Sequence, residues 1–310
     1  MISIFAMTRS TTPVTTPESS PERLNAACEW CRALCSLDLL LDLIICLFIG
    51  YGPLVLPQHE RPPPVEKVQL PQAGDLGAEV YLRARVFDNA VVADSVTSLA
   101  LLFVNLSIPI VVAVLLSVAA PVRGAAKAWV HSYVWTMAFS EFLVGCGKRY
   151  CGYWRPHFLH ECEFNATIGA CTFDDHQMFR SFPSAHASSS MAALLHTSYR
   201  LLGACRVASI PRRLQLGRSP AASVDLSGLL TSLCLLPMSL AWWIALSRVS
   251  DNAHHPADVV GGVLIGGGSA TLWYLRYFHA PFSDLSHRPR VEHSPGFKVA
   301  DGDVREPRAV

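Results

Sequence analysis

The chain has 310 residues, of which 51% are hydrophobic and only 16% are charged, and its formal net charge is +1. This composition excludes an ordinary soluble globular domain, in which about a quarter of the residues are charged. A membrane protein is therefore the first expectation, and no nucleic-acid partner is expected.

Six stretches are apolar enough to be predicted as membrane-spanning helices, because crossing a bilayer takes about 20 predominantly apolar residues. They are residues 37–56, 94–119, 128–145, 185–202, 226–246 and 259–278. The first contains Asp38 and Asp42, and the fourth is rich in serine. A helix with one polar side fits the inside of a bundle around a polar cavity better than a lipid-facing position. The predicted fold class is an all-α, polytopic membrane protein, a bundle of six transmembrane helices.

Both ends of the chain are polar. Residues 1–36 include a segment rich in Ser, Thr and Pro, and residues 279–310 contain scattered Pro and Gly. Neither segment can bury enough apolar surface to order itself. We therefore expect disordered tails at 1–36 and 279–310, on either side of one transmembrane domain at 37–278.

Lys and Arg gather in two connecting segments, which predicts that these segments face the cytoplasm. The segment between the second and third stretches carries Arg123 and Lys127. The segment between the fourth and fifth carries Arg200, Arg206, Arg212, Arg213 and Arg218. Both tails are then cytosolic, and the segments at 57–93, 147–183 and 247–258 are lumenal or extracellular. Three polar clusters fall in or beside these outer segments, so all three are expected on one face of a plasma membrane or endomembrane such as the ER or Golgi.

The first cluster follows the third stretch and supplies the cations Lys148, Arg149 and Arg155. Guanidinium groups bind phosphate oxygens through paired hydrogen bonds, and an ammonium acts as a point charge. Pro156 favours an extended backbone at Arg155, which suits a side chain held in a fixed direction. Taken alone, such a run is more often a lipid-headgroup contact or a topology signal.

The second cluster is Pro183-Ser184-Ala185-His186, at the entry to the fourth stretch. Ser184 after a proline is a natural N-cap, so the simplest interpretation is the start of a helix. The same geometry points helix amides and the serine hydroxyl at an anion. His186 would then lie within reach of a leaving-group oxygen.

The third cluster runs from Ser247 to Asp258. His254 and Asp258 are four residues apart, so on a helix beginning here they share one face, and the carboxylate can hold the imidazole in one tautomer. An oriented neutral imidazole is a competent nucleophile toward phosphorus. The alternatives are a helix-capping Asp258, a pair of histidines at the membrane surface, and a metal site built from His254, His255 and Asp258. None of these explains Arg248 and the other two clusters.

The order and spacing of the three clusters resemble the signature motifs of the type 2 phosphatidic acid phosphatase superfamily, most closely its lipid phosphate phosphatase branch. The resemblance covers residues 37–278, with the detailed matches between residues 148 and 265. The chain departs from the family at Ala185, where glycine is usual. If that glycine is needed for a positive φ or for close approach of the backbone to phosphate, alanine reduces activity, whereas if it serves only tight packing, alanine costs little.

The resemblance implies an active site at the lumenal or extracellular interface of the bundle, working through a phosphohistidine intermediate. His254 would attack the phosphate monoester, His186 would protonate the departing alkoxide, and Asp258 would orient His254. No metal or other cofactor is expected, because side-chain donors take over the stabilisation of the phosphate charge. These donors are Lys148, Arg155, Ser184 and Arg248.

The substrates that the resemblance implies are phosphatidate, lysophosphatidate, and sphingosine or ceramide phosphate. The expected partners are such a lipid phosphate and the surrounding membrane lipids, and self-association into a homo-oligomer is also implied. One alternative is a lipid phosphotransferase of the same superfamily, which passes the phosphoryl group to a lipid hydroxyl. The other is a noncatalytic signalling or scaffold protein, although that branch loses motif residues that are present here.

The second outer segment carries two features of a secreted environment. Asn165-Ala166-Thr167 is an acceptor sequence for N-glycosylation, placed where lumenal enzymes could reach it. Cys162 and Cys171 flank this acceptor, so a loop-closing disulfide is plausible in an oxidising compartment.

Overall fold

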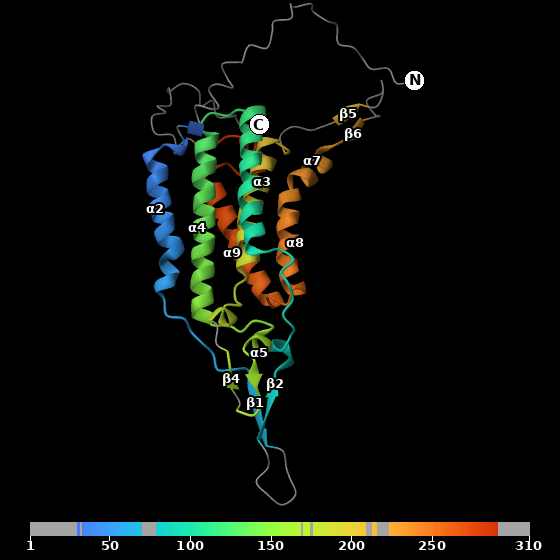
Figure 1. The fold of residues 1–310 in the computed structure, drawn as a ribbon. Coiled ribbons are helices and arrows are strands. Elements are labelled where there is room, and N and C mark those ends of the chain that lie inside the picture. Colours follow the sequence, from blue (N-terminus) through green and yellow to red (C-terminus); the bar gives the residue numbers. More distant parts are fainter. Residues whose placement is uncertain are drawn as a thin grey trace, which may run out of the picture.

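The computed structural model describes residues 30–31, 33–69, 79–168, 170–173, 176–208, 213–215 and 223–290. Within these residues the chain is mostly helical. Long helices pack side by side in one bundle, with small strands beyond its ends (Figure 1). The expected tails lie outside the described residues at 1–29 and 291–310, as do Arg212 and Arg218.

Each stretch predicted to span the membrane contains a long helix or, in one case, a bent pair. The helices are α2 (Leu37–Tyr51), α3 (Ser98–Ala119), α4 (Ala125–Cys151), α6 (Ala185–Ala204), α7 (Ser227–Cys234), α8 (Leu236–Ser250) and α9 (Pro256–Tyr277). In the described part of the chain, two helices are long and apolar enough to cross a membrane: α3, and α2 with its 3-10 extension η1 (Gly52–Val55). The pair α7 and α8 is a third candidate if its 46° bend is part of one span. Pro237 in the first turn of α8 accounts for the bend, because proline cannot donate the hydrogen bond that would continue α7.

The smaller elements lie in the connecting segments. Strands β1 (Val65–Gln69) and β2 (Glu79–Arg83) form an antiparallel hairpin in which Val65 pairs with Arg83. The segment after α4 contains helix α5 (Phe158–Glu161), strands β3 (Phe164–Asn165) and β4 (Ala170–Cys171), and the 3-10 turn η3 (His176–Phe179). Another 3-10 turn, η2 (Arg85–Phe87), precedes α3, and β5 (Arg213–Gln215) pairs with β6 (Ser223–Asp225). In Figure 1, the β1–β2 hairpin and α5 lie at one end of the bundle, and β5 and β6 lie at the other.

Helix α6 occupies the middle of the bundle and contacts α3, α4, α8 and α9. Its serines are buried, and Ser188, Ser190 and Ser198 are hydrogen-bonded, so the polar character of this stretch is explained by its central position. Ser188 Oγ lies 2.8 Å from Ser140 Oγ of α4. Ser198 Oγ accepts a hydrogen bond from the backbone N–H of Met238 in α8. Such interhelical bonds satisfy polar groups that lipid could not.

Helices α6 and α9 approach each other closely because α9 presents glycines to α6. A Cβ atom at Gly262 would lie 2.4 Å from the Ser184 carbonyl oxygen, and one at Gly266 would lie 2.1 Å from that of Ser188. Glycines four residues apart fall on one face of a helix and let two backbones meet. This contact sets the N-terminus of α6 against the N-terminus of α9, where the second and third clusters lie.

The two aspartates that weaken the first predicted span have partners on α4. Asp38 forms an ion pair with Lys127 at 2.7 Å, and Asp42 forms a short contact with the ring of His131. The carboxylates are one helical turn apart and meet partners that are also one turn apart. They therefore form a polar seam between α2 and α4 rather than facing lipid unpaired.

The expected boundaries of the transmembrane domain are too narrow at both ends. Ala33 is buried, and the ring of Trp30 packs against that of Trp129 at 5.8 Å. At the other end, residues 279–290 turn back onto the bundle: Phe278 bridges to Pro289, and the buried Ser286 donates a hydrogen bond to the Gly203 carbonyl. The amino-acid composition of such short polar segments does not predict that they pack against the bundle.

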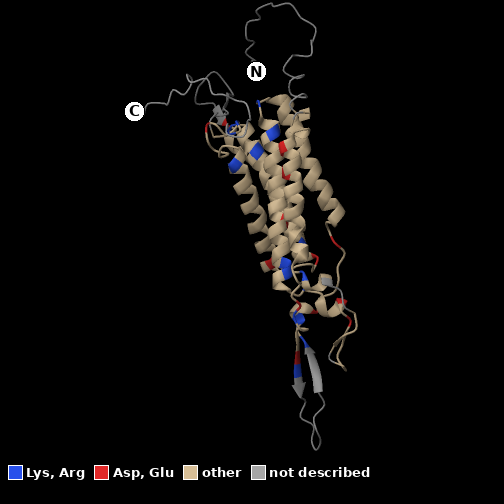
Figure 2. Cartoon of the chain, turned by 90° about the vertical axis from the view of Figure 1, so that its left-hand side faces the viewer, with Lys and Arg blue, Asp and Glu red and all other residues tan. Residues whose placement is uncertain are grey.

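The charged residues are distributed unevenly along the axis of the bundle. Figure 2 shows that Lys and Arg gather toward its two ends, while the middle is mostly uncharged. This distribution fits a bundle whose middle lies in a hydrocarbon layer. The end opposite β5 and β6 holds the three clusters.

Candidate active site

The three clusters meet at the end of the bundle that carries the β1–β2 hairpin. Helix α4 ends there with Lys148 in its last turn, α6 begins there after Ser184, and the turn between α8 and α9 contains His254. The Ser184 backbone N–H donates to the Asp258 carbonyl at 2.9 Å. Lys148 Nζ donates to the Arg180 carbonyl, in the segment leading to Ser184, at 3.0 Å. Segments more than 100 residues apart in the sequence thus converge on one site.

His254 and Asp258 are neighbours, but not on one helical face as expected. Helix α9 begins at Pro256, since proline is favoured in a first turn, and His254 therefore precedes the helix. Asp258 reaches back from the first turn, and its Oδ2 lies 3.6 Å from His254 Nδ1. That separation is too long for a good hydrogen bond. His255 is the closer partner, donating to Oδ2 from its backbone N–H at 2.9 Å and lying 3.2 Å away through Nδ1.

Ser181 is a site residue that sequence analysis missed. It is fully buried, and its hydroxyl donates to Asp258 Oδ2 at 2.6 Å. Burial alone would raise the pKa of Asp258, but hydrogen bonds from His255 and Ser181, together with the nearby ring of His254, outweigh burial and hold this pKa well below its usual range. The carboxylate is therefore charged at neutral pH. No spacing rule marks Ser181, because it meets Asp258 only through the fold.

His254 is buried, with 4% of its surface exposed. Burial lowers the pKa of this imidazole to about 4; Asp258 opposes this effect, and the cations Lys148 and Arg155 add to it. Among the described residues, its Nδ1 has no hydrogen-bond partner. The ring is thus neutral at physiological pH, as a histidine nucleophile must be.

Arg248 is 1% exposed and engaged by two carboxylates that were not predicted as site residues. Its NH1 donates to Asp94 Oδ1 at 3.1 Å, and its NH2 forms a short ion pair with Asp251. Asp251 in turn accepts hydrogen bonds from Ser95, at 2.9 Å from the backbone and 2.6 Å from the hydroxyl. The stretch predicted as a span from residue 94 is non-helical up to Thr97 for this reason: residues 94–96 bind the α8–α9 turn instead.

The predicted cations differ in where they point. Arg155 donates from Nε to the Gln177 carbonyl at 3.1 Å, and both Lys148 and Arg155 interact electrostatically with Asp258. Arg149 instead donates to the Leu56 carbonyl at 2.6 Å, beside η1. Lys148 and Arg155 therefore lie at the candidate site, whereas Arg149 contacts the chain beside η1 instead.

Ser184 is the N-cap of α6, as the simple interpretation predicts, and its hydroxyl accepts from the Ala187 N–H at 3.5 Å. His186 lies in the first turn and interacts with Arg248, Asp94 and the Val96 backbone. In the described part of the chain its Nε2 has no hydrogen-bond partner. Ala185 is the first residue of α6 and has a helical backbone, so the glycine usual in the family is not needed here for a left-handed conformation.

The metal-site alternative for the third cluster is not supported by the arrangement of its side chains. His254, His255 and Asp258 do not form a ligand group, and no three His, Cys, Asp or Glu side chains among the described residues do. Asp258 Oδ2 is already occupied by donors from Ser181 and His255.

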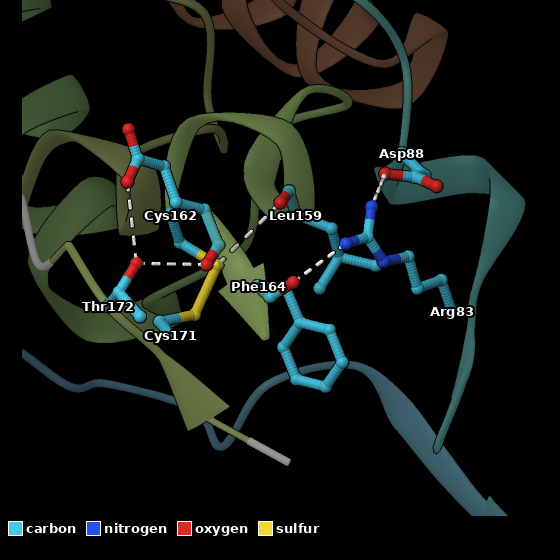
Figure 3. The surroundings of a disulfide bond; sticks show 8 residues. Arg83, Asp88, Leu159, Cys162, Phe164, Cys171 and Thr172 are labelled. Atoms are coloured by element: carbon cyan, nitrogen blue, oxygen red, sulfur yellow. Dashed lines mark hydrogen bonds and ion pairs between the residues drawn. A yellow bond between two sulfur atoms is a disulfide. The ribbon is translucent and has the colours of Figure 1, made fainter. Parts of the chain in front are cut away.

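The segment that follows α4, beside the candidate site, is closed by the Cys162–Cys171 disulfide, with the two Cα atoms 5.1 Å apart. Figure 3 shows this bond next to Phe164, whose carbonyl accepts a hydrogen bond from Arg83 at 2.7 Å, while Arg83 also pairs with Asp88. These contacts fasten the β1–β2 hairpin to the segment that carries Arg155. Asn165 is exposed on the same segment, and its Oδ1 accepts from the Thr167 N–H at 2.9 Å.

Comparison with known proteins identifies one domain. Residues 129–281 match the family model of the PAP2 superfamily. Relatives include lipid phosphate phosphatase 2 of Arabidopsis thaliana, 37% identical over 105 residues, and diacylglycerol pyrophosphate phosphatase 1 of Saccharomyces cerevisiae, 30% identical over 173 residues. Lipid A 1-phosphatase of Rhizobium etli is 27% identical over 150 residues.

The matches to these three relatives cover 33%, 51% and 48% of this chain and 31%, 53% and 51% of theirs, so the chain spans about half of their length or less. No solved structure matches the chain. The matched domain contains all three clusters, from α4 to the turn before α9. Residues 129–281 therefore form a PAP2 superfamily domain, and this chain is similar to proteins that include lipid phosphate phosphatases.

Proposed function

We propose that the protein is an integral membrane phosphatase that removes phosphate from lipid phosphate monoesters. The observation that carries the proposal is the convergence of two histidines and three cations at one end of the bundle, with His254 buried and neutral. A phosphate dianion needs cationic donors around its oxygens and a neutral nucleophile in line with its leaving group. The names of the relatives fit this chemistry.

In the proposed reaction, His254 attacks phosphorus and the bond from phosphorus to the lipid oxygen breaks. His186 gives its proton to the departing alkoxide, which leaves as a lipid alcohol. Water, deprotonated by His186, then breaks the phosphorus–nitrogen bond and releases inorganic phosphate. Asp258, held by Ser181 and His255, stabilises the charge that develops on His254.

Four groups bind the phosphate oxygens in this proposal: Lys148, Arg155, Arg248 and Ser184. The ammonium of Lys148 and the guanidinium of Arg155 lie on the side of α4, and Arg248 lies on the side of α8. The N-terminus of α6 adds its amides and dipole, which favour an anion. With this many donors the reaction needs no metal ion.

The proposed topology has six spans, with both termini in the cytosol and the site on the lumenal or extracellular side. Helices α4, α6 and α9 are long enough to span a membrane but less apolar than a lipid-exposed span. Their polar residues lie where these helices pack against one another. Buried polar faces are expected of helices inside a bundle. Glycosylation of Asn165 and pairing of Cys162 with Cys171 belong to the same proposal, since both need an oxidising, lumenal compartment.

The test is phosphate release by purified protein in detergent from phosphatidate, lysophosphatidate and sphingosine phosphate, with a metal chelator present. We expect release by the wild type and a loss of at least about a thousandfold in His254→Ala, because the nucleophile is removed. Transfer of the phosphoryl group to an added lipid alcohol, without release of inorganic phosphate, would instead indicate a phosphotransferase. Equal or absent release in both proteins would contradict catalysis by this site.

A further inference from the structure

A cavity of about 420 Å³ opens between α3 and α4, next to the candidate active site. Most of its lining is apolar: Leu101, Leu102 and Leu106 come from α3, and Val134 and Met137 come from α4. A cavity of this size and lining fits part of a hydrocarbon chain. Ser98 lies at its active-site end, two residues after Val96, whose carbonyl accepts from Arg248.

Besides the hydroxyl groups of Ser98, Tyr133 and Ser189, a carboxyl and an amide group interrupt this apolar lining. Glu141 of α4 and Asn105 of α3 both face the cavity, although each lies within a stretch predicted to cross the membrane. Asn105 is 4% exposed, and its Oδ1 has no partner among the described residues. The hydrogen bonds and ion pairs of the described part of the chain include none to the Glu141 carboxyl. Asn105 is buried, whereas Glu141 is exposed on the surface of the bundle. Where that surface lies in the hydrocarbon layer, a carboxyl and an unpaired amide oxygen are costly unless a ligand satisfies them.

The position of Glu141 relates the cavity to the phosphate site. Lys148 follows Glu141 by seven residues on α4, which places both side chains on one face about 10 Å apart along the helix axis. The two charges interact electrostatically. A lipid whose phosphate lies against Lys148 would therefore place the first atoms of its chain near Glu141.

We propose that Glu141 and Asn105 recognise a hydrogen-bond donor on the substrate, an ammonium or hydroxyl group close to its phosphate. Both protein groups present acceptor oxygens, and an ammonium complements the charge of a carboxylate. Long-chain amino-alcohol phosphates carry such donors. Diacyl phosphatidate has only ester carbonyls there, which are acceptors. Glu141 is thus a specificity-determining residue that favours sphingoid-type phosphates.

This inference rests on the proposed phosphatase function, and its test separates the two. In mixed detergent micelles with equal lipid fractions, kcat/KM is measured for sphingosine phosphate and for phosphatidate. We expect the wild type to prefer sphingosine phosphate by at least about tenfold. In Glu141→Gln, which keeps shape but removes the charge, the ratio of the two kcat/KM values falls about tenfold or more, as expected for loss of a charge-assisted bond.

Glu163→Gln is the matched control, because it makes the same chemical change on the exposed outer segment. Its ratio should equal that of the wild type. A Glu141→Gln ratio equal to the wild-type ratio would overturn the inference while leaving phosphatase activity intact. Absence of release from every substrate in the wild type would instead overturn the proposed function.

A measurement on the wild type alone covers the case in which Glu141→Gln does not fold. Ceramide phosphate keeps the phosphate and long chain of sphingosine phosphate, but its amide has no positive charge. We expect its kcat/KM to lie about tenfold below that of sphingosine phosphate. Equal values for the charged and uncharged substrates would also overturn the inference.

Discussion

Ser181→Ala tests whether the carboxylate of Asp258 is held in place by a donor that no motif contains. The substitution removes the 2.6 Å hydrogen bond from the Ser181 hydroxyl to Asp258 Oδ2 and leaves the two contacts from His255. A hydrogen bond to a charged group contributes about 1.5–3 kcal/mol. Because two donors remain, we expect the lower end of this range.

In activity, about 1.5 kcal/mol corresponds to a roughly tenfold loss, since 1.36 kcal/mol is a factor of ten in rate. The loss should appear in kcat, with KM nearly unchanged, because Ser181 acts on the carboxylate and touches no substrate group. The assay is release of inorganic phosphate across a range of lipid fractions in mixed micelles, with thermal unfolding measured in parallel.

Ser269→Ala is the matched control for this experiment. Ser269 is also buried, but its hydroxyl donates to the Ile265 carbonyl within α9, which remains helical without it. Its kcat should stay within about twofold of wild type. If Ser181→Ala matched this control in kcat, the argument that donors to Oδ2 position Asp258 would be refuted.

Three further predictions concern packing, pH and topology. Gly266→Ala should lower the free energy of unfolding by about 1–3 kcal/mol, because the new Cβ would lie 2.1 Å from the Ser188 carbonyl oxygen. Gly228→Ala is the control and should not lower it, because the space around Gly228 is open. The melting temperatures of the two variants are compared with that of the wild type. Since burial lowers the pKa of His254 to about 4, protonation of this nucleophile should lower kcat/KM on the acid side of the pH profile, as pH drops through about 4, and loss of the His186 proton should lower it on the alkaline side. The contribution of the His254 ring to stability should be complete above about pH 6.5 and lost as pH falls from there to 4. Asn165→Gln should abolish a glycosidase-sensitive mass shift in protein from eukaryotic cells; a shift that persisted would contradict modification of this residue.

The main residues of the candidate site could be predicted from the sequence because they lie in short motifs with fixed spacing. Residues Lys148, Ser184 and His254 each sit at a helix end, and hydropathy alone predicts which ends share a face. The polar fourth stretch was correctly placed inside the bundle, since its serines have no other stable environment. The start of α9 was misjudged, because the four-residue spacing of His254 and Asp258 suggested one helix although Pro256 stands between them.

What the sequence could not show are partners brought together only by the tertiary fold. Asp94 and Ser95 are more than 150 residues from the α8–α9 turn that they contact, and nothing in their local sequence marks them. Glu141 likewise counts as a single charge in an apolar stretch until the cavity beside it is known. Contacts between residues so far apart in the sequence follow no sequence periodicity and no fixed spacing, so they cannot be predicted from a single sequence.

The carboxylates around Arg248 indicate how a phosphate would enter the site. A guanidinium that is 1% exposed must be paired in the absence of substrate, because an unpaired buried charge is strongly destabilising. Asp251 is 4% exposed and fixed by Ser95, whereas the side chain of Asp94 is 43% exposed. Turning Asp94 into water therefore costs much less than moving Asp251. If a phosphate oxygen replaces Asp94, Arg248 keeps an anionic partner before and after the exchange. The buried guanidinium can therefore bind substrate without becoming an unpaired charge.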